Sequence, residues 1–290
     1  MRSKLFVPGA RPELFVKAIT SQADAISIDL EDSVREDRKA RARADVTEFL
    51  GSAEIAATGK TVIVRVNALT SPHFAADVMA VARPGVALVN LPKAESADDI
   101  RAAVAVIEHA EALNRLDRPI GILANIETPQ ALHRAAEIAA AHARVVGLQL
   151  GLADLFEPLG VDRRDSRNVH AAMFAMRMAA GAAGVFAYDG AFADVQDAQG
   201  YSAEAAMAHR LGYLGKSCIH PSQIALANEV FRPSAEDIAF SLRVLEEARQ
   251  AELGKRGAFM VDGRMVDAPF IRRAETIVAI ARNLGLAQNE

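Results

Sequence analysis

Three features that often reveal a protein's class are missing from this sequence of 290 residues. The single cysteine, Cys218, excludes an intrachain disulfide framework and a multi-cysteine metal cluster. No apolar run approaches the ~18 residues that a membrane-spanning helix needs, and the apolar stretch after Met1 is too short for a secretory signal. We therefore expect a cytoplasmic protein that does not contact a membrane.

The sequence also lacks an excess of charge of one sign and the glycine-rich motifs of phosphate-binding loops. Its 33 basic and 37 acidic residues are interspersed and give a net charge of -4, so we expect no nucleic-acid surface. Neither GxGxxG nor GxxxxGK[ST] occurs. What the sequence does have is 51% hydrophobic residues, enough to bury a core and to exclude a disordered chain. These observations favour a globular α/β enzyme.

Short apolar runs alternate with alanine-rich stretches of helical spacing along most of the chain. The alternation is typical of parallel strands and helices, and eight repeats predict an α/β fold of the (β/α)8 TIM-barrel type. A doubly wound sheet of eight strands is the alternative, but the repeats show no half-way break. A barrel also explains how one domain can use about 250 residues. The runs lie at residues 4–7, 25–30, 61–66, 86–91, 120–126, 145–150, 184–188 and 215–219.

The last part of the chain departs from this repeat. Residues 234–253 read as a helix that Ser234 caps, with Asp237 three positions further on. A glycine-bearing segment follows over 254–269, and a final helix is expected over 269–284. We therefore divide the chain into a barrel over 1–233 and a C-terminal helical arm over 234–290, which we expect to cover a face of the barrel or to reach a neighbouring subunit.

Charged or titratable residues follow nearly every apolar run. In a parallel barrel these positions share one end, where catalytic groups lie. Polar loops are the ordinary explanation for any one of these residues, but many adjoin their run directly. They are Asp29, Glu31 and Asp32 after the second run, Arg65 after the third, Lys93 after the fourth, Glu127 after the fifth, Asp154 after the sixth, Asp189 after the seventh and His220 after the eighth.

Glu127 and Asp154 follow neighbouring strands, so their carboxylates are expected to converge. Two like charges in one place repel unless a proton or a cation lies between them. With no histidine or cysteine cluster nearby, hard oxygen ligands indicate Mg²⁺, which takes further ligands from water or substrate. The alternative is that both acids only cap helices, and spacing alone does not separate the two interpretations.

Arg65 could hold a substrate carboxylate or enolate oxygen, form an ion pair with Glu31 or Asp32, or do both. The turn Gly151, Leu152 and Ala153 would offer backbone N–H groups to a substrate carboxylate at a helix start. His220 is interpreted as an orienting hydrogen bonder rather than a metal ligand, and Cys218 as a buried small apolar residue.

At these residues the chain resembles the HpcH/HpaI aldolase and citrate lyase family, in its citrate lyase β-subunit-like (CitE-like) branch. The stretches that carry the resemblance run from end to end in the family's order. They are RSKLFVPG at 2–9, DLEDSV at 29–34, VRVN at 64–67, LPKAE at 91–95, IET at 126–128, GLADL at 151–155, IHPSQ at 219–223 and VDGRMVD at 261–267.

The resemblance implies a trimeric or hexameric barrel that makes or breaks a C–C bond between an acyl-CoA enolate and an oxoacid. It places the family's Mg²⁺ carboxylates on Glu127 and Asp154 and its substrate arginine on Arg65. Asp267 would be the acid/base group, brought by the C-terminal arm to the site of an adjacent subunit. Asp29, Glu31, Asp32 and His220 would hold Arg65 or metal-bound waters in place.

Two other activities remain open within this resemblance. One is an aldolase that acts on free pyruvate-type enolates without a thioester. The other is a citrate lyase β subunit, whose thioester substrate is tethered to a carrier protein. Which acyl group the chain would take is also open, with malyl-, citramalyl- and citryl-CoA as the candidates.

Overall fold

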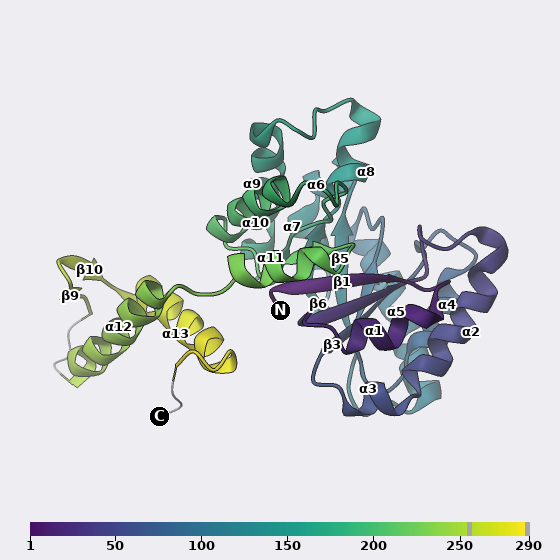
Figure 1. Ribbon diagram of the computed structural model, residues 1–290, viewed down its shortest axis with the longest axis horizontal. Coiled ribbons are helices and arrows are strands. Elements are labelled where there is room, and N and C mark those ends of the chain that lie inside the picture. The colour runs from purple at the N-terminus through teal and green to yellow at the C-terminus, as the bar shows by residue number, and fades with distance from the viewer. Residues whose placement is uncertain (254–256, 288–290) are drawn as a thin grey trace. The chain divides into compact units, whose positions relative to one another are not determined.

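A computed structural model describes residues 1–253 and 257–287 and divides the chain into two compact units, Met1–Phe231 and Arg232–Glu290 (Figure 1). The first unit ends close to the boundary that we placed at residue 233. Among the described residues, no helix is both long and apolar enough to cross a bilayer.

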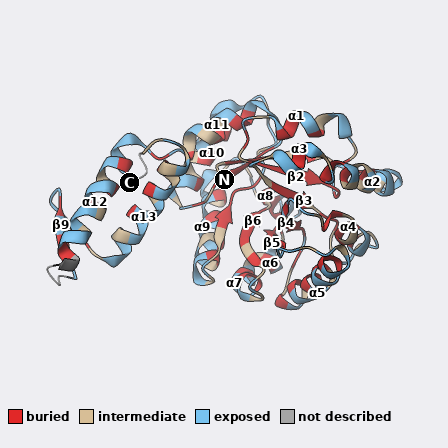
Figure 2. Ribbon diagram, turned by 90° about the horizontal axis from the view of Figure 1, so that it is seen from below, coloured by how far each residue is buried: buried red, intermediate tan, exposed pale blue. Residues whose placement is uncertain are grey.

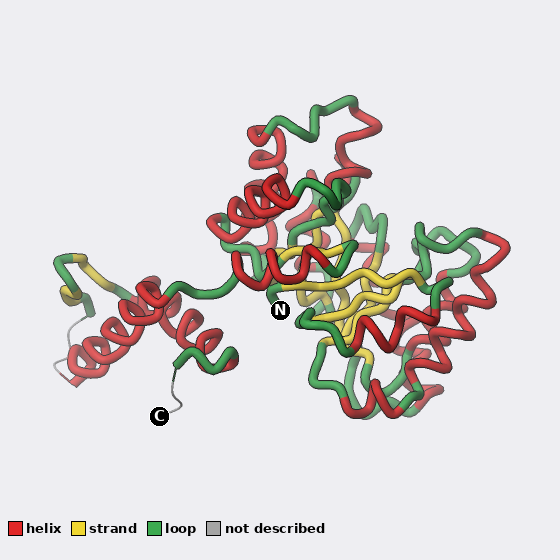
Figure 3. Tube along the Cα trace, viewed as in Figure 1, coloured by secondary structure: helices red, strands yellow, loops and turns green. Residues whose placement is uncertain are grey.

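The first unit is built on a sheet of eight parallel strands in the order β7-β6-β5-β4-β3-β2-β1-β8. The remaining edges, β7 and β8, meet at a bridge between Asp189 and Lys216, where the Asp189 N–H donates to the Gly215 carbonyl at 2.9 Å. The sheet therefore closes on itself, and helices surround it (Figure 3). The predicted (β/α)8 TIM barrel is confirmed, and the doubly wound alternative is wrong. The strands are β1 (Ser3–Pro8), β2 (Ala25–Asp29), β3 (Thr61–Arg65), β4 (Val86–Leu91), β5 (Gly121–Ile126), β6 (Val145–Leu150), β7 (Phe186–Tyr188) and β8 (Lys216–Cys218).

The helices begin at the polar residues that cap them. Ser96 accepts a hydrogen bond from the Asp99 N–H at the start of α5, and Thr128 accepts one from the Ala131 N–H at the start of α6. The alanine-rich stretch over 129–142 forms two short helices, because Arg134 leaves the helical conformation between them. The helices of this unit are α1 (Phe15–Ile19), α2 (Lys39–Leu50), α3 (Ala53–Ala57), α4 (Phe74–Val81), α5 (Ala97–Asn114), α6 (Pro129–His133), α7 (Ala135–Ala140), α8 (Leu152–Phe156), α9 (Ser166–Ala182), α10 (Ala198–Arg210) and α11 (Ser222–Val230), with 3-10 turns at Pro12–Leu14, Glu36–Arg38 and Glu157–Leu159.

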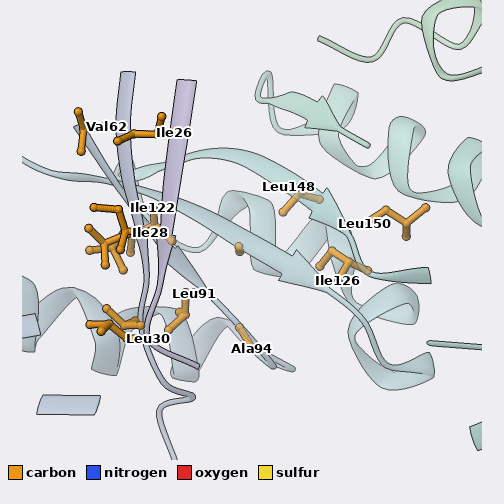
Figure 4. Close-up of a cluster of buried hydrophobic side chains, with 14 of the residues drawn as sticks. Ile26, Ile28, Leu30, Val62, Leu91, Ala94, Ile122, Ile126, Leu148 and Leu150 are labelled. Carbon is orange, nitrogen blue, oxygen red and sulfur yellow. The ribbon is translucent and has the colours of Figure 1, made fainter. Parts of the chain in front are cut away.

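The two faces of the strands differ in polarity. One set of alternate residues, including Ile26, Ile28 and Leu148, belongs to a large apolar cluster with the helices (Figure 4). The strands and the helix faces that pack on them are largely buried (Figure 2). The other set combines buried polar residues with buried apolar ones such as Ile63 and Leu123, so the inside of the barrel is partly polar. The apolar runs are therefore not as uniform as the sequence suggested. The buried polar residues of this set are Lys4, Ser27, Asp29, Asn90, Asn125, Gln149 and Ser217.

The second unit contains α12 (Ala235–Leu253), a hairpin of β9 (Phe259–Val261) and β10 (Arg264–Val266), and α13 (Ala268–Asn283). Ser234 caps α12 as expected, since its Oγ accepts the Asp237 N–H at 3.0 Å. The hairpin turns at Asp262 and Gly263, which both have positive φ, 49° and 76°. We did not predict this hairpin, although an Asp-Gly pair is a strong signal for such a turn.

Candidate active site

Arg65, the last residue of β3, lies at the centre of a group of acids at the carboxyl ends of the strands. Its Nε donates to Asp29 Oδ1 at 2.7 Å and its Nη2 donates to Asp29 Oδ2 at 2.8 Å. The same group lies 3.1 Å from Glu31 Oε2 and 3.3 Å from Asp32 Oδ2. Burial alone would raise the pKa of Asp29, but its hydrogen bonds with Arg65 hold it below the ordinary value. The ion pairs that we considered for Arg65 are therefore present.

Glu127 follows β5 directly and is almost completely buried, with 2% of its surface exposed. Its Oε1 accepts the Lys93 N–H at 2.8 Å, and its Oε2 accepts the Asn125 side-chain amide at 3.2 Å. Burial and then the negative charges of Glu31 and Asp154 raise the pKa of Glu127 to about 7. Glu127 is thus a buried carboxyl group whose neighbours disfavour its charge.

Gly151, at the end of β6, forms the wall next to Glu127. A Cβ atom on residue 151 would lie 2.6 Å from the Glu127 Cβ and 2.9 Å from Oε2. No such distance is tolerated between unbonded atoms, so only glycine lets Glu127 keep this position. Glu127 therefore accepts the Lys93 N–H on one side and packs against the backbone of Gly151 on the other.

Asp154 is exposed in the first turn of α8, and its charge acts on Glu127. The helix-capping alternative for Glu127 is wrong, because Thr128 caps α6. Within residues 1–253 and 257–287, no group of three or more His, Cys, Asp or Glu side chains is arranged to hold a metal ion. One buried and one exposed carboxylate do suit a hard cation that takes its other ligands from water or substrate, so the donor set fits Mg²⁺ and not an all-protein cage.

The turn after β6 differs in part from what we expected. The Gly151 N–H donates to the Ile126 carbonyl at 2.9 Å, so it is not available to a substrate, because it extends the β5–β6 ladder. Leu152 and Ala153 begin α8, where N–H groups have no partner within the helix. For these two residues, contact with a substrate remains a prediction.

His220 lines a different part of the first unit, and Asp267 belongs to the second unit. The His220 ring bonds the Ser222 Oγ at 2.8 Å and lines a cavity of about 340 Å³ with Asp197 and Tyr201. Asp267 precedes α13 in the second unit, and its buried Oδ1 has no hydrogen-bond partner among the described residues. The roles that we predicted for both residues remain predictions.

Two lysines for which we predicted no role contact residues of the barrel interior and of the site. Lys93 bonds Glu127 through its N–H and Glu31 through its Nζ, at 2.8 and 2.9 Å. Lys4 is fully buried in the barrel, where its Nζ bonds the Gln149 side chain, and burial lowers its pKa well below the ordinary value. A single charged residue within an apolar run was the signal for Lys4.

The chain is similar to known lyases, to citrate lyase β subunits and to CitE proteins. The chain is 34% identical to L-malyl-CoA/beta-methylmalyl-CoA lyase from Cereibacter sphaeroides, over 96% of this chain and 93% of that protein. It is 32% identical to citrate lyase subunit beta from Leuconostoc mesenteroides, over 100% and 96%. The crystal structure of protein CitE from Mycobacterium tuberculosis, in complex with magnesium, acetoacetate and coenzyme A, superposes with a TM-score of 0.74 at 35% identity and covers 97% of this chain and 100% of that one.

The sequence pattern of one family matches most of the barrel unit. The HpcH/HpaI aldolase/citrate lyase pattern matches residues 2–221, which include Arg65, Glu127 and Asp154. These relatives agree with the family likeness that the motifs indicated, and they are themselves named lyases or citrate lyase subunits. The chain belongs to the HpcH/HpaI aldolase/citrate lyase family.

Proposed function

We propose that this protein is a Mg²⁺-dependent carbon–carbon lyase or synthase that acts on 3-hydroxyacyl-CoA thioesters of the malyl, citramalyl or citryl type. The observation that carries the proposal is the buried carboxyl of Glu127, which neighbouring acids destabilise and a cation would stabilise. A relative 35% identical to this chain holds magnesium, a 3-oxoacid and coenzyme A together, which supports the same combination here.

In this proposal Glu127 and Asp154 hold the cation through one carboxylate each. Bound there, Mg²⁺ would polarise the hydroxyl and carboxylate oxygens of the hydroxyacid. The exposure of Asp154 leaves that side of the site open to water or substrate. The substrate would therefore complete the coordination.

Arg65 would donate to the oxygen on which negative charge develops. Its ion pairs with Asp29, Glu31 and Asp32 fix the guanidinium before the substrate arrives, so that it need not reorganise during the reaction. One donor of this kind contributes about 3 to 4 kcal/mol in comparable sites. Leu152 and Ala153 would bind the substrate carboxylate with their N–H groups.

Cleavage breaks the bond between the hydroxyl-bearing carbon and the carbon next to the thioester. A base takes the hydroxyl proton, the carbonyl of the oxoacid forms, and the electron pair of the broken bond stays on the thioester enolate. Asp267 would then protonate the enolate carbon, or remove a proton from the acyl group in the direction of synthesis. An unpartnered buried carboxylate oxygen is costly, which supports a partner for Asp267 beyond the described residues of this chain.

That partner would belong to a second subunit. We propose a homotrimer or hexamer in which the arm of one subunit brings Asp267 to the barrel of the next. The arm would correspond to residues 234–290, with His220 as an orienting residue in the barrel. Mixing an Asp267→Asn variant with an Arg65→Ala variant tests this, because only mixed oligomers would regain intact sites. Two inactive variants that stay inactive after subunit exchange would contradict it.

A second candidate is the β subunit of a citrate lyase, acting on a carrier-bound thioester. Two curated citrate lyase β subunits, at 32% and 34% identity, match nearly the whole chain, which keeps this candidate open. A superfamily aldolase that acts on free pyruvate-type enolates would need no thioester. Both alternatives differ from the leading proposal in the form of the substrate.

The deciding experiment is a panel of malyl-, citramalyl- and citryl-CoA incubated with Mg²⁺ and scored for the shorter CoA ester and the oxoacid. Cleavage of one of them is the expected result. Turnover only of a carrier-bound substrate would favour the subunit, and aldol cleavage without any thioester would favour the aldolase.

Asp154→Ala tests the metal assignment within the same assay. We expect it to abolish Mg²⁺-dependent turnover and to leave the thermal unfolding midpoint unchanged, because Asp154 is exposed. Asp117→Ala, which removes another exposed acid, is the matched control and should retain full activity. An active Asp154→Ala variant would show that this residue does not hold the cation.

A further inference from the structure

Lys93 has an unusual backbone conformation. Its φ is 55°, in the left-handed region that residues with a side chain rarely adopt. The other two described non-glycine residues with positive φ have local explanations, since Arg115 ends α5 and Asp262 lies in the hairpin turn. Lys93 ends no helix and turns no hairpin; it follows β4 by two residues. Strain of this kind persists where the surroundings require it, often at functional sites.

The conformation lets one residue hold two acids. The Lys93 N–H reaches Glu127 Oε1 at 2.8 Å, while its Nζ reaches Glu31 Oε1 at 2.9 Å. Glu127 follows β5, whereas Glu31 lies in the loop after β2, so the two acids come from opposite sides of β4 and its neighbour β3. Lys93 is the residue that contacts both.

Glu31 lies near Glu127, because Lys93 contacts both carboxylates. Its negative charge is the largest electrostatic influence on Glu127 after burial. Its Oε2 is buried and has no hydrogen bond among the described residues, although Arg65 Nη1 lies 3.1 Å away as an ion-pair partner. Two cationic side chains, Arg65 and Lys93, therefore hold Glu31 in place.

We propose that Lys93 is a positioning residue with two tasks, orienting Glu127 through its N–H and keeping Glu31 away from the cation through its ammonium group. This inference rests on the proposed function. Two protein carboxylates leave coordination positions for the hydroxyl and carboxylate of a substrate. A third carboxylate would fill one of them and would suit Ca²⁺, which takes six to eight oxygen ligands, better than octahedral Mg²⁺.

The test compares the binding of Mg²⁺ and Ca²⁺ to the full-length protein without substrate, by calorimetric titration. In Lys93→Met the ammonium group is lost and the N–H is kept. We expect Ca²⁺ to bind about tenfold more tightly than it binds the wild type, with a smaller gain for Mg²⁺. Lys93→Gly also removes the ammonium group and suits a φ of 55°, so it gives the same comparison if Lys93→Met does not fold.

Two further variants identify the cause. Adding Glu31→Gln to Lys93→Met should return the Ca²⁺ to Mg²⁺ affinity ratio to the wild-type value, because the released acid is then gone. Lys17→Met removes an exposed lysine of α1 and should leave the ratio unchanged.

The outcomes separate this inference from the proposed function. A wild-type protein that binds no Mg²⁺ would overturn the proposed function and this inference with it. If the wild type binds Mg²⁺ and Lys93→Met leaves the Ca²⁺ to Mg²⁺ affinity ratio unchanged, only this inference is overturned. The same holds if the loss of the lysine charge makes both ions bind more tightly by the same factor. A selective gain for Ca²⁺ that Glu31→Gln removes would support it.

Discussion

Replacing Glu127 with glutamine is expected to remove a pH-dependent part of the protein's stability. In the folded chain, burial and the nearby acids raise the pKa of Glu127 to about 7, from an ordinary value of 4.5. A raised pKa means that the folded state binds the proton more tightly than the unfolded state does. The free energy of unfolding therefore falls as pH rises from the ordinary pKa through about 7, by roughly 3 kcal/mol in total.

A cation reverses this dependence because it binds the ionised carboxylate. Below about pH 7, each bound Mg²⁺ should displace one proton from Glu127. The Mg²⁺ affinity should therefore fall about tenfold for each unit by which the pH is lowered, and it should stay constant above about pH 7. In chelator, ionisation of Glu127 lowers the free energy of unfolding of the protein. Saturating Mg²⁺ should restore that free energy.

Two measurements check this reasoning between about pH 5.5 and about pH 8. The first is urea unfolding in chelator of the wild type and of Glu127→Gln. The difference between their free energies of unfolding isolates the contribution of this one acid from that of other titrating groups. Calorimetric titration with Mg²⁺ follows the affinity over the same range. A wild-type Mg²⁺ affinity that does not change with pH, or a difference in stability that rises with pH, would refute the account of Glu127.

Two other substitutions test how the structure holds its charged groups. Gly151→Ala should lower turnover about a hundredfold and weaken Mg²⁺ binding, measured by steady-state kinetics and calorimetry, because its Cβ would lie 2.6 Å from the Glu127 Cβ and displace that side chain. Lys216→Met should lower the free energy of unfolding by about 3 to 5 kcal/mol in urea, because Lys216 is fully buried and pairs with Asp189 at 2.6 Å and Glu204 at 2.7 Å.

Each of these substitutions has a matched control. At Gly59 an added Cβ would meet no atom within 4 Å, so Gly59→Ala should behave as the wild type. Lys17→Met removes an exposed lysine and should cost little stability. Normal turnover in Gly151→Ala would show that Glu127 does not need its present position, and a stable Lys216→Met variant would show that the buried acids do not need the ammonium group.

The fold was accessible from sequence because it depends on a repeated pattern. Seven of the eight apolar runs contain a strand of the barrel, among them β7 and β8 in the runs at 184–188 and 215–219, and the run at 4–7 lies within β1. Since parallel strands end at the same face, the pattern also brought Arg65, Glu127 and Asp154 together. Ser234 could be identified as a cap because capping is local in sequence.

What the sequence did not reveal depends on contacts across the barrel or on backbone conformation. Lys93 stood out only as a charge after a strand, since neither its positive φ nor its two acidic partners can be read from neighbouring residues. The Gly151 N–H was expected to face a substrate, yet the sheet uses it. Lys4 pairs with Gln149, far along the chain, and such pairings follow only from the closed barrel.

The most direct test of the central claim is a crystal structure of the protein soaked with Mn²⁺ in place of Mg²⁺ and measured for anomalous scattering. The account predicts one peak that lies about 2.0 to 2.2 Å from a carboxylate oxygen of Glu127 and from one of Asp154. A peak bound by other residues, or no peak at these two carboxylates, would contradict it.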